Sequence, residues 1–435
     1  MSDLRFAIGK FKGVKAVVMG DIMLDRWTFG DVDRISPEAP VPVVLKKSEK
    51  ITLGGAANVA NNLAALGASV SLVGVMGDDE AGDLITGLLE QSNIDAKAIL
   101  RFSNRPTIEK QRIVFGENHQ LLRLDSEQRG NLTPTEEERS YALLLPLVKE
   151  CDVIVLSDYG KGFFSEQFAQ KIIALAKTEK KTVLADLKPA HKKYFFGVDV
   201  ITPNLKEARE MTGLSDLLDV GPKLVQEFGA HAIVTLGGEG MSLFRREDAS
   251  HYHAPGKKIK VFDVSGAGDT SIAVLALGMA GGLNIDDAVM LANEAGSIVV
   301  QKPGTATLSR EELMSALRTT NHVEGISMTP KVWGYERWVE NNDRYCCKIL
   351  GVNKGYQCSL HYHKNKDETF LVTEGQIRFE LGDEVMHLRP GSFIRVPPNT
   401  PHRFAGIEDS LIMEFSTHHD DADSYRIEES RKMDE

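Results

Sequence analysis

Cysteine is scarce in this sequence, which has four cysteines among 435 residues. Cys151, Cys346, Cys347 and Cys358 lack the paired spacing of a zinc site. The adjacent Cys346 and Cys347 cannot both face one site on a strand, because successive side chains point to opposite faces. A reduced, intracellular protein is the simplest interpretation.

Long apolar runs are missing as well. No run approaches the roughly 20 residues that cross a bilayer. The opening sequence MSDLRFAIGKFKGVKAVVMGD also lacks the apolar region of a signal peptide. These two absences predict a soluble protein of the cytoplasm with no membrane partner.

Positive charge is not in excess, because the net charge is −11. This balance disfavours a general nucleic-acid or acidic-membrane partner, although backbone amides and a few local Lys or Arg residues can still hold small anions. With 42% hydrophobic and 26% charged residues, the composition is that of a globular protein and excludes disorder for most of the chain. The length predicts two or three domains, or one large domain and a small one.

Short apolar runs alternate with helical patterns from the start of the chain to about residue 318. Runs rich in Val and Ile predict buried strands at 15–21, 69–77, 151–160, 181–186 and 230–238. Helical patterns occupy 55–67, 165–180 and 267–280. This order predicts an α/β domain with a mostly parallel sheet and helices on both faces.

Residues 97–125 differ from their surroundings, because short alternating strands follow one another there without helices. The segments are AKAILRF, TIEKQRIVFG and HQLLRLD. Together with PVPVVLK near residue 43, they predict a small β lid that is set apart from the main sheet.

The pattern changes again after residue 320. The stretch NHVEGISMTPK contains Gly, Pro and small polar residues, which predicts a linker at 321–330 after a first domain at 1–320. Short, closely spaced strands with Gly, Asp and Pro turns then predict a small all-β barrel at 331–420. Residues 421–435 are acidic and polar, and form either a tail or a cap over the barrel.

Two glycine-rich segments carry candidate chemistry in the first domain. Gly54 and Gly55 precede a helix whose first turn holds Asn58, so a ligand can approach the backbone and Asn58 can bind hydroxyls. In DVSGAGDT, at 263–270, backbone N–H groups at a helix N-terminus form an anion cradle. The Asp269 carboxylate lies against this cradle, where it can take a proton from a hydroxyl as a phosphoryl group arrives. A simple helix cap is the plainer alternative for Asp269.

These segments carry a resemblance to a known family. GGAANVANNLAALG and DVSGAGDT match both signatures of the ribokinase-like (phosphofructokinase-B type) sugar kinases, and TPNLKE resembles the Asn-x-x-Glu motif of that family. VMGDIMLDRW, RISPEAPVPVV, VLSDYGKG and LITPNLKE further resemble the heptose-phosphate kinases of bacterial lipopolysaccharide biosynthesis. Those enzymes phosphorylate the anomeric hydroxyl of D-glycero-β-D-manno-heptose 7-phosphate. The resemblance covers nearly all of residues 5–318.

The resemblance implies a role for each matching residue and a requirement for ATP and Mg²⁺. It makes Asp269 the catalytic base. The anion hole that it implies consists of Gly266, Ala267 and Gly268. The residues that it implies for the Mg²⁺–phosphate region are Asn204 and Glu207. Those that it implies at the border of the nucleotide are Gly237, Gly240 and Asn293. The residues that it implies for binding the sugar hydroxyls are Asp21, Gly54, Gly55 and Asn58.

A phosphorylated sugar also needs cations, and the candidates are Lys110, Arg112 and Lys161, each of which can equally be a solvated surface charge. The segment ADLKP at 185–189 departs from the family pattern, so a ribose, fructose or nucleoside-like substrate stays as an alternative. A kinase without activity is disfavoured because Asp269 and the Asn-x-x-Glu motif are present. Related kinases commonly dimerise through the β lid, which implies a homodimer here.

The second domain contains a histidine motif. His361 and His363 alternate on one strand and therefore share a face, and Glu368 follows just beyond it. Glycines at 355 and 375 frame this motif, and a second motif runs from Gly391 through Pro397 to His402. Three imidazoles and a carboxylate suit one divalent transition metal, Zn²⁺, Mn²⁺, Fe²⁺, Ni²⁺ or Co²⁺. The alternative is a pair of strand histidines that face solvent.

Both motifs fit the cupin pattern at every spacing, except that Asn399 replaces a usual glycine and must tolerate a left-handed backbone. The segments KDETFLVTEGQIRFELGD and PPNTPHRF resemble sugar-phosphate isomerase cupins of the mannose-6-phosphate isomerase type. The resemblance implies a metal-assisted isomerisation of a related sugar phosphate. A non-catalytic module that binds a sugar and regulates the kinase stays open, because fold does not give function.

Overall fold

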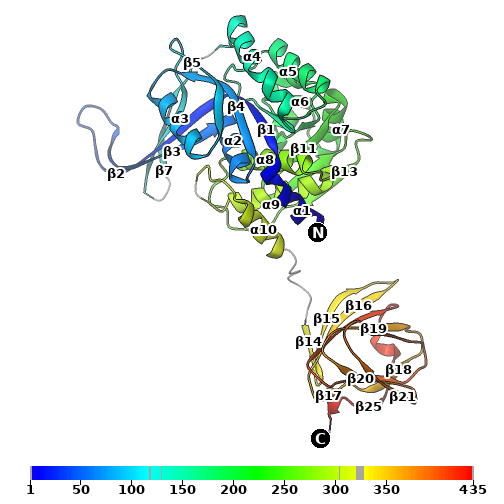
Figure 1. Cartoon of the computed structure of the whole chain (residues 1–435). Coiled ribbons are helices and arrows are strands. Elements are labelled where there is room, and N and C mark those ends of the chain that lie inside the picture. Colours follow the sequence, from blue (N-terminus) through cyan, green and yellow to red (C-terminus); the bar gives the residue numbers. More distant parts are fainter. Residues whose placement is uncertain (1, 117–118, 129, 303, 320–327, 434–435) are drawn as a thin grey trace. The chain divides into compact units, whose positions relative to one another are not determined.

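The computed structural model describes residues 2–116, 119–128, 130–302, 304–319 and 328–433, which belong to two compact units, Met1–Thr320 and Asn321–Glu435 (Figure 1). In the first unit a nine-stranded sheet has the order β13-β12-β11-β10-β9-β8-β1-β4-β5. Its strands are β1 (Lys15–Gly20), β4 (Ser69–Gly77), β5 (Asp95–Phe102), β8 (Val153–Ser157), β9 (Thr182–Asp186), β10 (Val200–Ile201), β11 (His231–Thr235), β12 (Gly240–Phe244) and β13 (His251–Pro255). All neighbouring pairs are parallel except β11–β12 and β12–β13.

Helices cover both faces of this sheet because alternate strand residues point to opposite faces. Ala16 and Val18 of β1 pack into one hydrophobic cluster, whereas Val17 and Met19 pack into another. The first cluster includes residues of α1 (Ser2–Lys10), α2 (Ala56–Ala65), α3 (Glu80–Gln91), α8 (Ala267–Ala280), α9 (Ile285–Val299) and α10 (Arg310–Thr319). The second includes residues of α4 (Pro134–Glu150), α5 (Glu166–Thr178), α6 (Leu205–Thr212) and α7 (Leu217–Phe228). The predicted α/β class is confirmed.

A separate four-stranded sheet, order β3-β2-β6-β7, forms the lid, and its β2–β3 hairpin projects from the unit (Figure 1). Its strands are β2 (Ile22–Ile35), β3 (Pro42–Gly55), β6 (Ile108–Phe115) and β7 (His119–Ser126). The assignment of residues 97–102 to this lid is wrong, because β5 pairs with β4 at the edge of the main sheet. An edge strand buries alternate residues, here Ala98, Leu100 and Phe102, so its sequence has the same alternation as a lid strand.

The second unit is all β, as expected. One sheet has the order β14-β15-β16-β24-β19-β22, and the other has β21-β20-β23-β17-β26, with β18 and β25 paired beside β23. The strands are β14 (Met328–Lys331), β15 (Gly334–Asn341), β16 (Cys346–Val352), β17 (Tyr356–Gln357), β18 (Leu360–His363), β19 (Glu368–Glu374), β20 (Ile377–Leu381), β21 (Glu384–Leu388), β22 (Phe393–Val396), β23 (His402–Gly406), β24 (Ser410–Ser416), β25 (Ser424–Glu428) and β26 (Arg431–Lys432).

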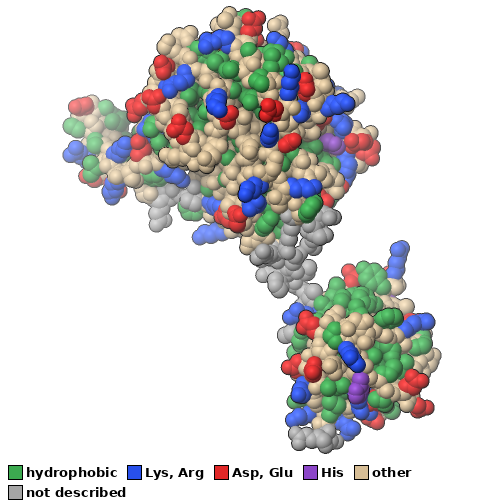
Figure 2. Space-filling view, viewed as in Figure 1, with side chains coloured by type: hydrophobic (Ala, Val, Ile, Leu, Met, Phe, Trp, Pro, Cys, Tyr) green, Lys and Arg blue, Asp and Glu red, His purple; other side chains and the backbone are tan. Residues whose placement is uncertain are grey.

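The ends of this unit differ in detail from the sequence-based boundaries. Residues 321–327 of the proposed linker lie outside the described residues, and β14 already begins at Met328. Residues after 420 contribute β25 and β26, which pair with β18 and β17. Acidic and basic side chains are interspersed on the faces visible in Figure 2. Within the described part of the chain, no helix combines the length and the apolar character that crossing a membrane requires.

Candidate active site and metal centre

The candidate active site lies where parallel strands end. Residues that follow or end β8, β9, β10 and β11 line one cavity of about 220 Å³ together with the N-terminus of α8. Carboxyl ends of parallel strands are where open α/β sheets bind ligands. Helix α8 begins after Gly266, whose φ of 79° lies in the left-handed region. A Cβ there would stand 2.9 Å from Asn58 Nδ2, so this close approach requires glycine.

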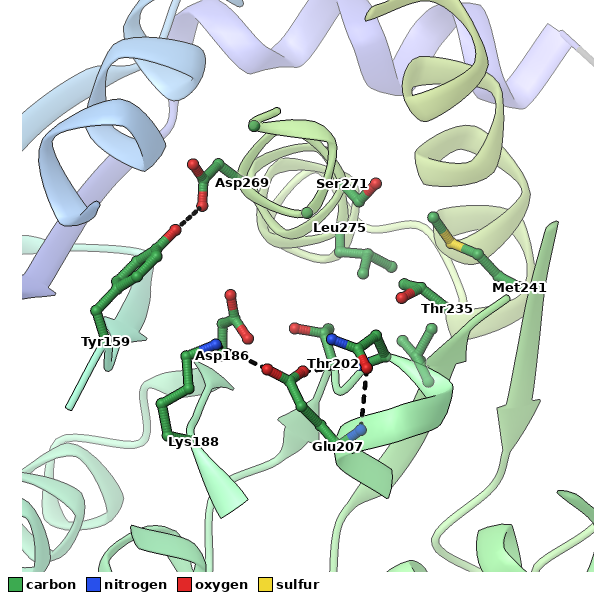
Figure 3. Close-up of a pocket in the computed structure, with 14 residues that line it drawn as sticks. Tyr159, Asp186, Lys188, Thr202, Glu207, Thr235, Met241, Asp269, Ser271 and Leu275 are labelled. Atoms are coloured by element: carbon green, nitrogen blue, oxygen red, sulfur yellow. Dashed lines mark hydrogen bonds and ion pairs between the residues drawn. The ribbon is translucent and has the colours of Figure 1, made fainter. Parts of the chain in front are cut away.

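The Asp269 carboxylate is held from two sides in the first turn of α8. Asn58 Nδ2 donates to its Oδ2 at 2.6 Å. The Tyr159 hydroxyl donates to its Oδ1 at 2.7 Å, as Figure 3 shows. Burial raises the pKa of Asp269 to about 6, although both hydrogen bonds oppose that rise. A carboxylate with such a pKa is ionised at neutral pH and remains basic enough to take a proton from a hydroxyl.

Across the cavity, Asn204 and Glu207 form the N-terminus of α6. The Asn204 side chain accepts from the Glu207 N–H at 2.9 Å, and the Glu207 carboxylate accepts from the Asn204 N–H at 3.1 Å. Glu207 also receives a 2.7 Å hydrogen bond from Lys188 Nζ (Figure 3). This capping box fixes both side chains beside the carboxylate of Asp186, whose pKa burial raises to about 7.

A second, largely apolar cavity of about 330 Å³ adjoins the first, since Thr235, Met241, Gly268 and Ser271 line both. It is lined by residues that sequence reasoning assigned to the nucleotide border: Gly237, Gly240 and Asn293, together with Ala267. Asn293 Nδ2 donates to the Pro255 carbonyl at 2.8 Å. The apolar cavity therefore adjoins the polar cavity at the N-terminus of α8.

The residues expected to bind the sugar hydroxyls differ in their contacts. Asp21 accepts hydrogen bonds from the backbone N–H groups of Tyr159, Lys161 and Phe163, at 2.9, 3.0 and 3.1 Å. Its carboxylate thus shapes the loop that carries Tyr159, and it also lines a small cavity beside Lys161. Gly54 and Gly55 end β3 where a Cβ would clash, at 2.4 Å from Asp25 Oδ2 and 2.3 Å from the Asp21 carbonyl.

The three candidate cations lie near one another. Arg112 Nη1 donates to Asp25 Oδ1 at 2.6 Å, and Lys161 pairs with Glu127. Lys110 lies over the Tyr159 ring with Nζ 5.5 Å from the centroid. Burial lowers the pKa of Lys110, and the charges of Lys161 and Arg112 contribute to the same shift. A cluster of like charges of this kind can bind an anionic group.

Sequence reasoning missed three residues that line the polar cavity: Tyr159, Asp186 and Lys188. All three belong to segments that the sequence analysis had quoted, VLSDYGKG and ADLKP. The strand-end position of each was a usable signal, but their side-chain partners lie about 20 to 110 residues away along the chain. Such contacts follow from the fold and not from local spacing.

In the second unit, His361, His363 and His402 place ligand atoms within 4.8 Å of one another. His361 of β18 and His402 of β23 are direct cross-strand neighbours. Each ring donates its Nδ1–H to a backbone carbonyl, of Ser359 at 2.8 Å, Asp423 at 2.8 Å and Thr400 at 3.0 Å respectively. These hydrogen bonds fix the tautomer and leave the Nε2 lone pair of all three rings free for a metal ion.

Glu368 stands beside this histidine cluster. Its carboxylate lies 3.0 Å from His402 Nε2 and 3.6 Å from His363 Nε2. Among the side chains that the structure describes, His402 Nε2 and Glu368 Oε2 are buried atoms without a hydrogen-bond partner. Burial lowers the pKa of His361 to about 4, so that ring is neutral at physiological pH. The donor set of three imidazoles and a carboxylate therefore fits a divalent transition metal.

The turn that delivers His402 is intact. Asn399, which replaces a usual glycine, has a φ of 63°, and its N–H donates to the His363 carbonyl at 2.6 Å. Lys366 is buried and pairs with both Glu368 and Glu414. The histidine cluster opens into a cavity of about 750 Å³, which is also lined by Lys366 and Lys348.

Comparisons with known proteins match each of the two units to a protein family. Residues 15–312 match the pfkB family carbohydrate kinase family, and residues 349–417 match the Cupin domain family. The chain is similar to two proteins named Bifunctional protein HldE. The one from Desulfatibacillum aliphaticivorans is 40% identical over 320 residues, which are 72% of this chain and 65% of that protein. The one from Azorhizobium caulinodans is 41% identical over 309 residues, which are 70% of this chain and 64% of that protein.

This chain thus spans less than two thirds of the length of these curated relatives. Among solved structures, Arabidopsis thaliana ribokinase, complexed with ribose and ATP, has a TM-score of 0.57 at 18% identity, over 70% of this chain and 98% of that chain. Escherichia coli phosphofructokinase-2, in complex with potassium, has a TM-score of 0.58 at 18% identity, over 71% and 99%. At that identity the likeness establishes the fold of the first unit.

Proposed function

Because the chain belongs to the pfkB family of carbohydrate kinases, we propose that its first unit transfers a phosphoryl group from ATP to a sugar phosphate. The observation that carries this proposal is the position of Asp269, a buried carboxylate in the first turn of α8 beside Gly266 and Gly268. The polar cavity in front of it continues into the apolar cavity that suits an adenine base. A base, an anion cradle and a nucleotide-sized space thus adjoin one another.

The residues of the cavity fit the two cofactors. In this proposal Asn204, Glu207 and Asp186 serve Mg²⁺ and the phosphates of ATP, while Gly237, Gly240 and Asn293 border the nucleotide. Bound Mg²⁺ neutralises phosphate charge during phosphoryl transfer. The backbone N–H groups of Ala267 and Gly268 stabilise negative charge at the helix N-terminus. Asp269 accepts the proton of the attacking sugar hydroxyl at its carboxylate.

For the substrate we propose D-glycero-β-D-manno-heptose 7-phosphate, with the 1,7-bisphosphate as product. The support is the resemblance of RISPEAPVPVV and VLSDYGKG to heptose-phosphate kinases, together with the cluster of Lys110, Arg112 and Lys161. Relatives named Bifunctional protein HldE, about 40% identical, are in accord with this choice. A different sugar, such as ribose or fructose, is the alternative.

The test is a panel of heptose, hexose and pentose phosphates and their free sugars, assayed with ATP and the full chain by ADP release. The proposal expects the highest kcat/KM for the heptose 7-phosphate. A higher kcat/KM for a free pentose or hexose would contradict the proposed substrate. The absence of turnover with every compound of the panel would contradict the proposed kinase activity.

We also propose a homodimer through the lid. Large apolar side chains are exposed on the lid strands, among them Ile35, Leu45, Leu122 and Leu124. Leu122 and Leu124 alternate along β7 and therefore share a face, and exposed apolar surface of this kind can mark a protein–protein contact. The experiment is a mass measurement in solution for the full chain and for a Leu122→Glu/Leu124→Glu variant. A dimer that the variant dissociates agrees with the proposal, and a monomeric wild type contradicts it.

For the second unit we propose one divalent transition metal bound by His361, His363, His402 and Glu368, and an isomerase acting on a related sugar phosphate. The convergence of three free Nε2 atoms supports the metal. A bound metal polarises the oxygens of a carbonyl or hydroxyl group. The alternative is a regulatory module that only binds a sugar. An isomerase assay of the metal-loaded chain, with the His361→Ala/His363→Ala variant as blank, separates the two.

A further inference from the structure

The cavity of the second unit contains a buried lysine with an unusual set of partners. Lys348, on β16, is 3% exposed and lines the cavity into which His361 and His363 project. Its Nζ lies 3.9 Å from the centroid of the Trp338 ring and donates to His419 Nδ1 at 3.2 Å. Neither partner carries a negative charge when the imidazole is neutral.

No carboxylate oxygen of the described residues lies within 4.0 Å of Lys348 Nζ. Glu414 is its cross-strand neighbour on β24, but the Glu414 carboxylate is paired with Lys366. A buried ammonium without a counter-ion is costly, and buried charges in proteins are usually paired. Lys348 therefore lacks an anion that a bound ligand can supply.

The other basic side chains of the cavity are already paired. Four basic and four acidic side chains line it. The pairs other than those of Lys366 are Lys331–Glu336 at 3.4 Å and Arg426–Glu429 at 3.9 Å. The eight side-chain charges cancel, so the divalent metal ion of the proposed function leaves the cavity with a net positive charge of 2+. A ligand that complements this cavity is an anion.

We propose that Lys348 binds the anionic group of the cavity's ligand, and that this ligand is an anionic sugar derivative whose hydroxyl or carbonyl oxygens face the metal centre. The inference rests on the proposed metal site. The cavity of about 750 Å³ is within the size range of small-molecule sites. Imidazole and carboxylate ligands leave coordination positions open to sugar oxygens. The anion is a phosphate or a carboxylate, and the two are separated by experiment.

The experiment uses the full chain loaded with Co²⁺, whose visible absorption reports on the metal centre. The His361→Ala/His363→Ala variant must lose these bands, which assigns them to the second unit and separates them from ligand binding at the kinase site. Glucose 6-phosphate, gluconate and glucose are each titrated against the bands. The expected result is saturable binding of glucose 6-phosphate or gluconate, and much weaker binding of neutral glucose. Whichever anion binds more tightly identifies the phosphate or the carboxylate.

Lys348→Met is the decisive variant, with Lys354→Met as the control, because Lys354 is an exposed lysine of the same unit that does not line the cavity. Loss of one charge-assisted hydrogen bond should weaken anion binding about tenfold or more at unchanged metal content. Lys348→Arg keeps the charge and should retain most of the affinity, which excludes misfolding as the cause.

Three results overturn the inference: equal affinity of Lys348→Met and wild type, equal affinity for glucose and the anions, or no effect of any of the three compounds on a metal-loaded chain. A chain that takes up no metal at all contradicts the proposed metal site as well. The failure of the inference and the failure of the proposed function are therefore distinguishable.

Discussion

The Tyr159 hydroxyl donates a 2.7 Å hydrogen bond to Oδ1 of Asp269, the carboxylate that we propose as the catalytic base (Figure 3). The Tyr159 ring itself lies near two ammonium groups, with the Nζ atoms of Lys110 and Lys188 5.5 and 5.4 Å from its centroid. Tyr159 thus contacts both the proposed base and the two lysines. In the proposed reaction it therefore positions Asp269.

Tyr159→Phe should lower kcat and move the acid limb of the pH profile to higher pH. The hydroxyl favours the ionised form of Asp269, so its removal raises the pKa of that carboxylate. A hydrogen bond to a charged group contributes about 1.5–3 kcal/mol, which corresponds to a shift of about one unit or more. Tyr252→Phe, outside the cavities, is the control. An unchanged pH profile in Tyr159→Phe would leave the residue with a structural role only.

Wild-type activity should depend on the ionisation of Asp269. Burial raises its pKa to about 6, so the carboxylate is ionised and able to accept a proton above this pH and is protonated below it. We expect kcat/KM to fall about tenfold per pH unit below the pKa, measured at saturating ATP and Mg²⁺. A kcat/KM that stays constant down to about pH 5 would contradict a base with this pKa.

The purified chain should contain one divalent transition metal. His361→Ala/His363→Ala should contain none, because two of the three convergent imidazoles are lost. His387→Ala is the control, since His387 is an exposed histidine on β21 of the same unit. The measurement is elemental analysis after reconstitution. Equal metal content in the double variant and the wild type would remove these histidines from the site.

Lys366→Met should destabilise the metal-free second unit more than the metal-loaded one. Lys366 is buried between Glu368 and Glu414, and removing one partner of a buried ion pair costs about 3–5 kcal/mol. A bound metal supplies positive charge beside Glu368 and should recover part of this loss. Calorimetry of the full chain, with and without metal, follows the transition of this unit. Lys364→Met, an exposed neighbour, should leave it unchanged. Equal losses with and without metal would contradict the compensation.

Local patterns were enough to predict the elements whose residues are close in sequence. Continuous burial in β1 and β8 reflects a sheet covered on both faces. The turn at Asn399 adopts the left-handed backbone that its position requires. The alternation of apolar and polar residues gave a wrong prediction for the edge strand of the main sheet. Residues 97–102 alternate in sequence as a lid strand would, yet they extend the main sheet as part of β5.

Side-chain partners between distant segments could not be predicted. Tyr159 meets Asp269 because the ends of β8 and α8 converge, although 110 residues separate them. Lys348 lies opposite Glu414 in the pairing of β16 with β24, but the Glu414 carboxylate pairs with Lys366 instead. The sequence alone does not show that Lys348 lacks a carboxylate partner. Strand register and burial decide these contacts, and a single sequence specifies neither directly.

The most direct test of the central claim is ATP-dependent phosphorylation of D-glycero-β-D-manno-heptose 7-phosphate by the full chain and by its Asp269→Asn variant. We expect the wild type to release ADP and to form a product with a second phosphate on the anomeric oxygen. The variant should lose about 10²- to 10⁴-fold in kcat and should bind nucleotide normally, because an amide cannot accept the proton. A variant that retains most of the wild-type kcat would contradict the role of Asp269, and so would a wild type that transfers no phosphoryl group.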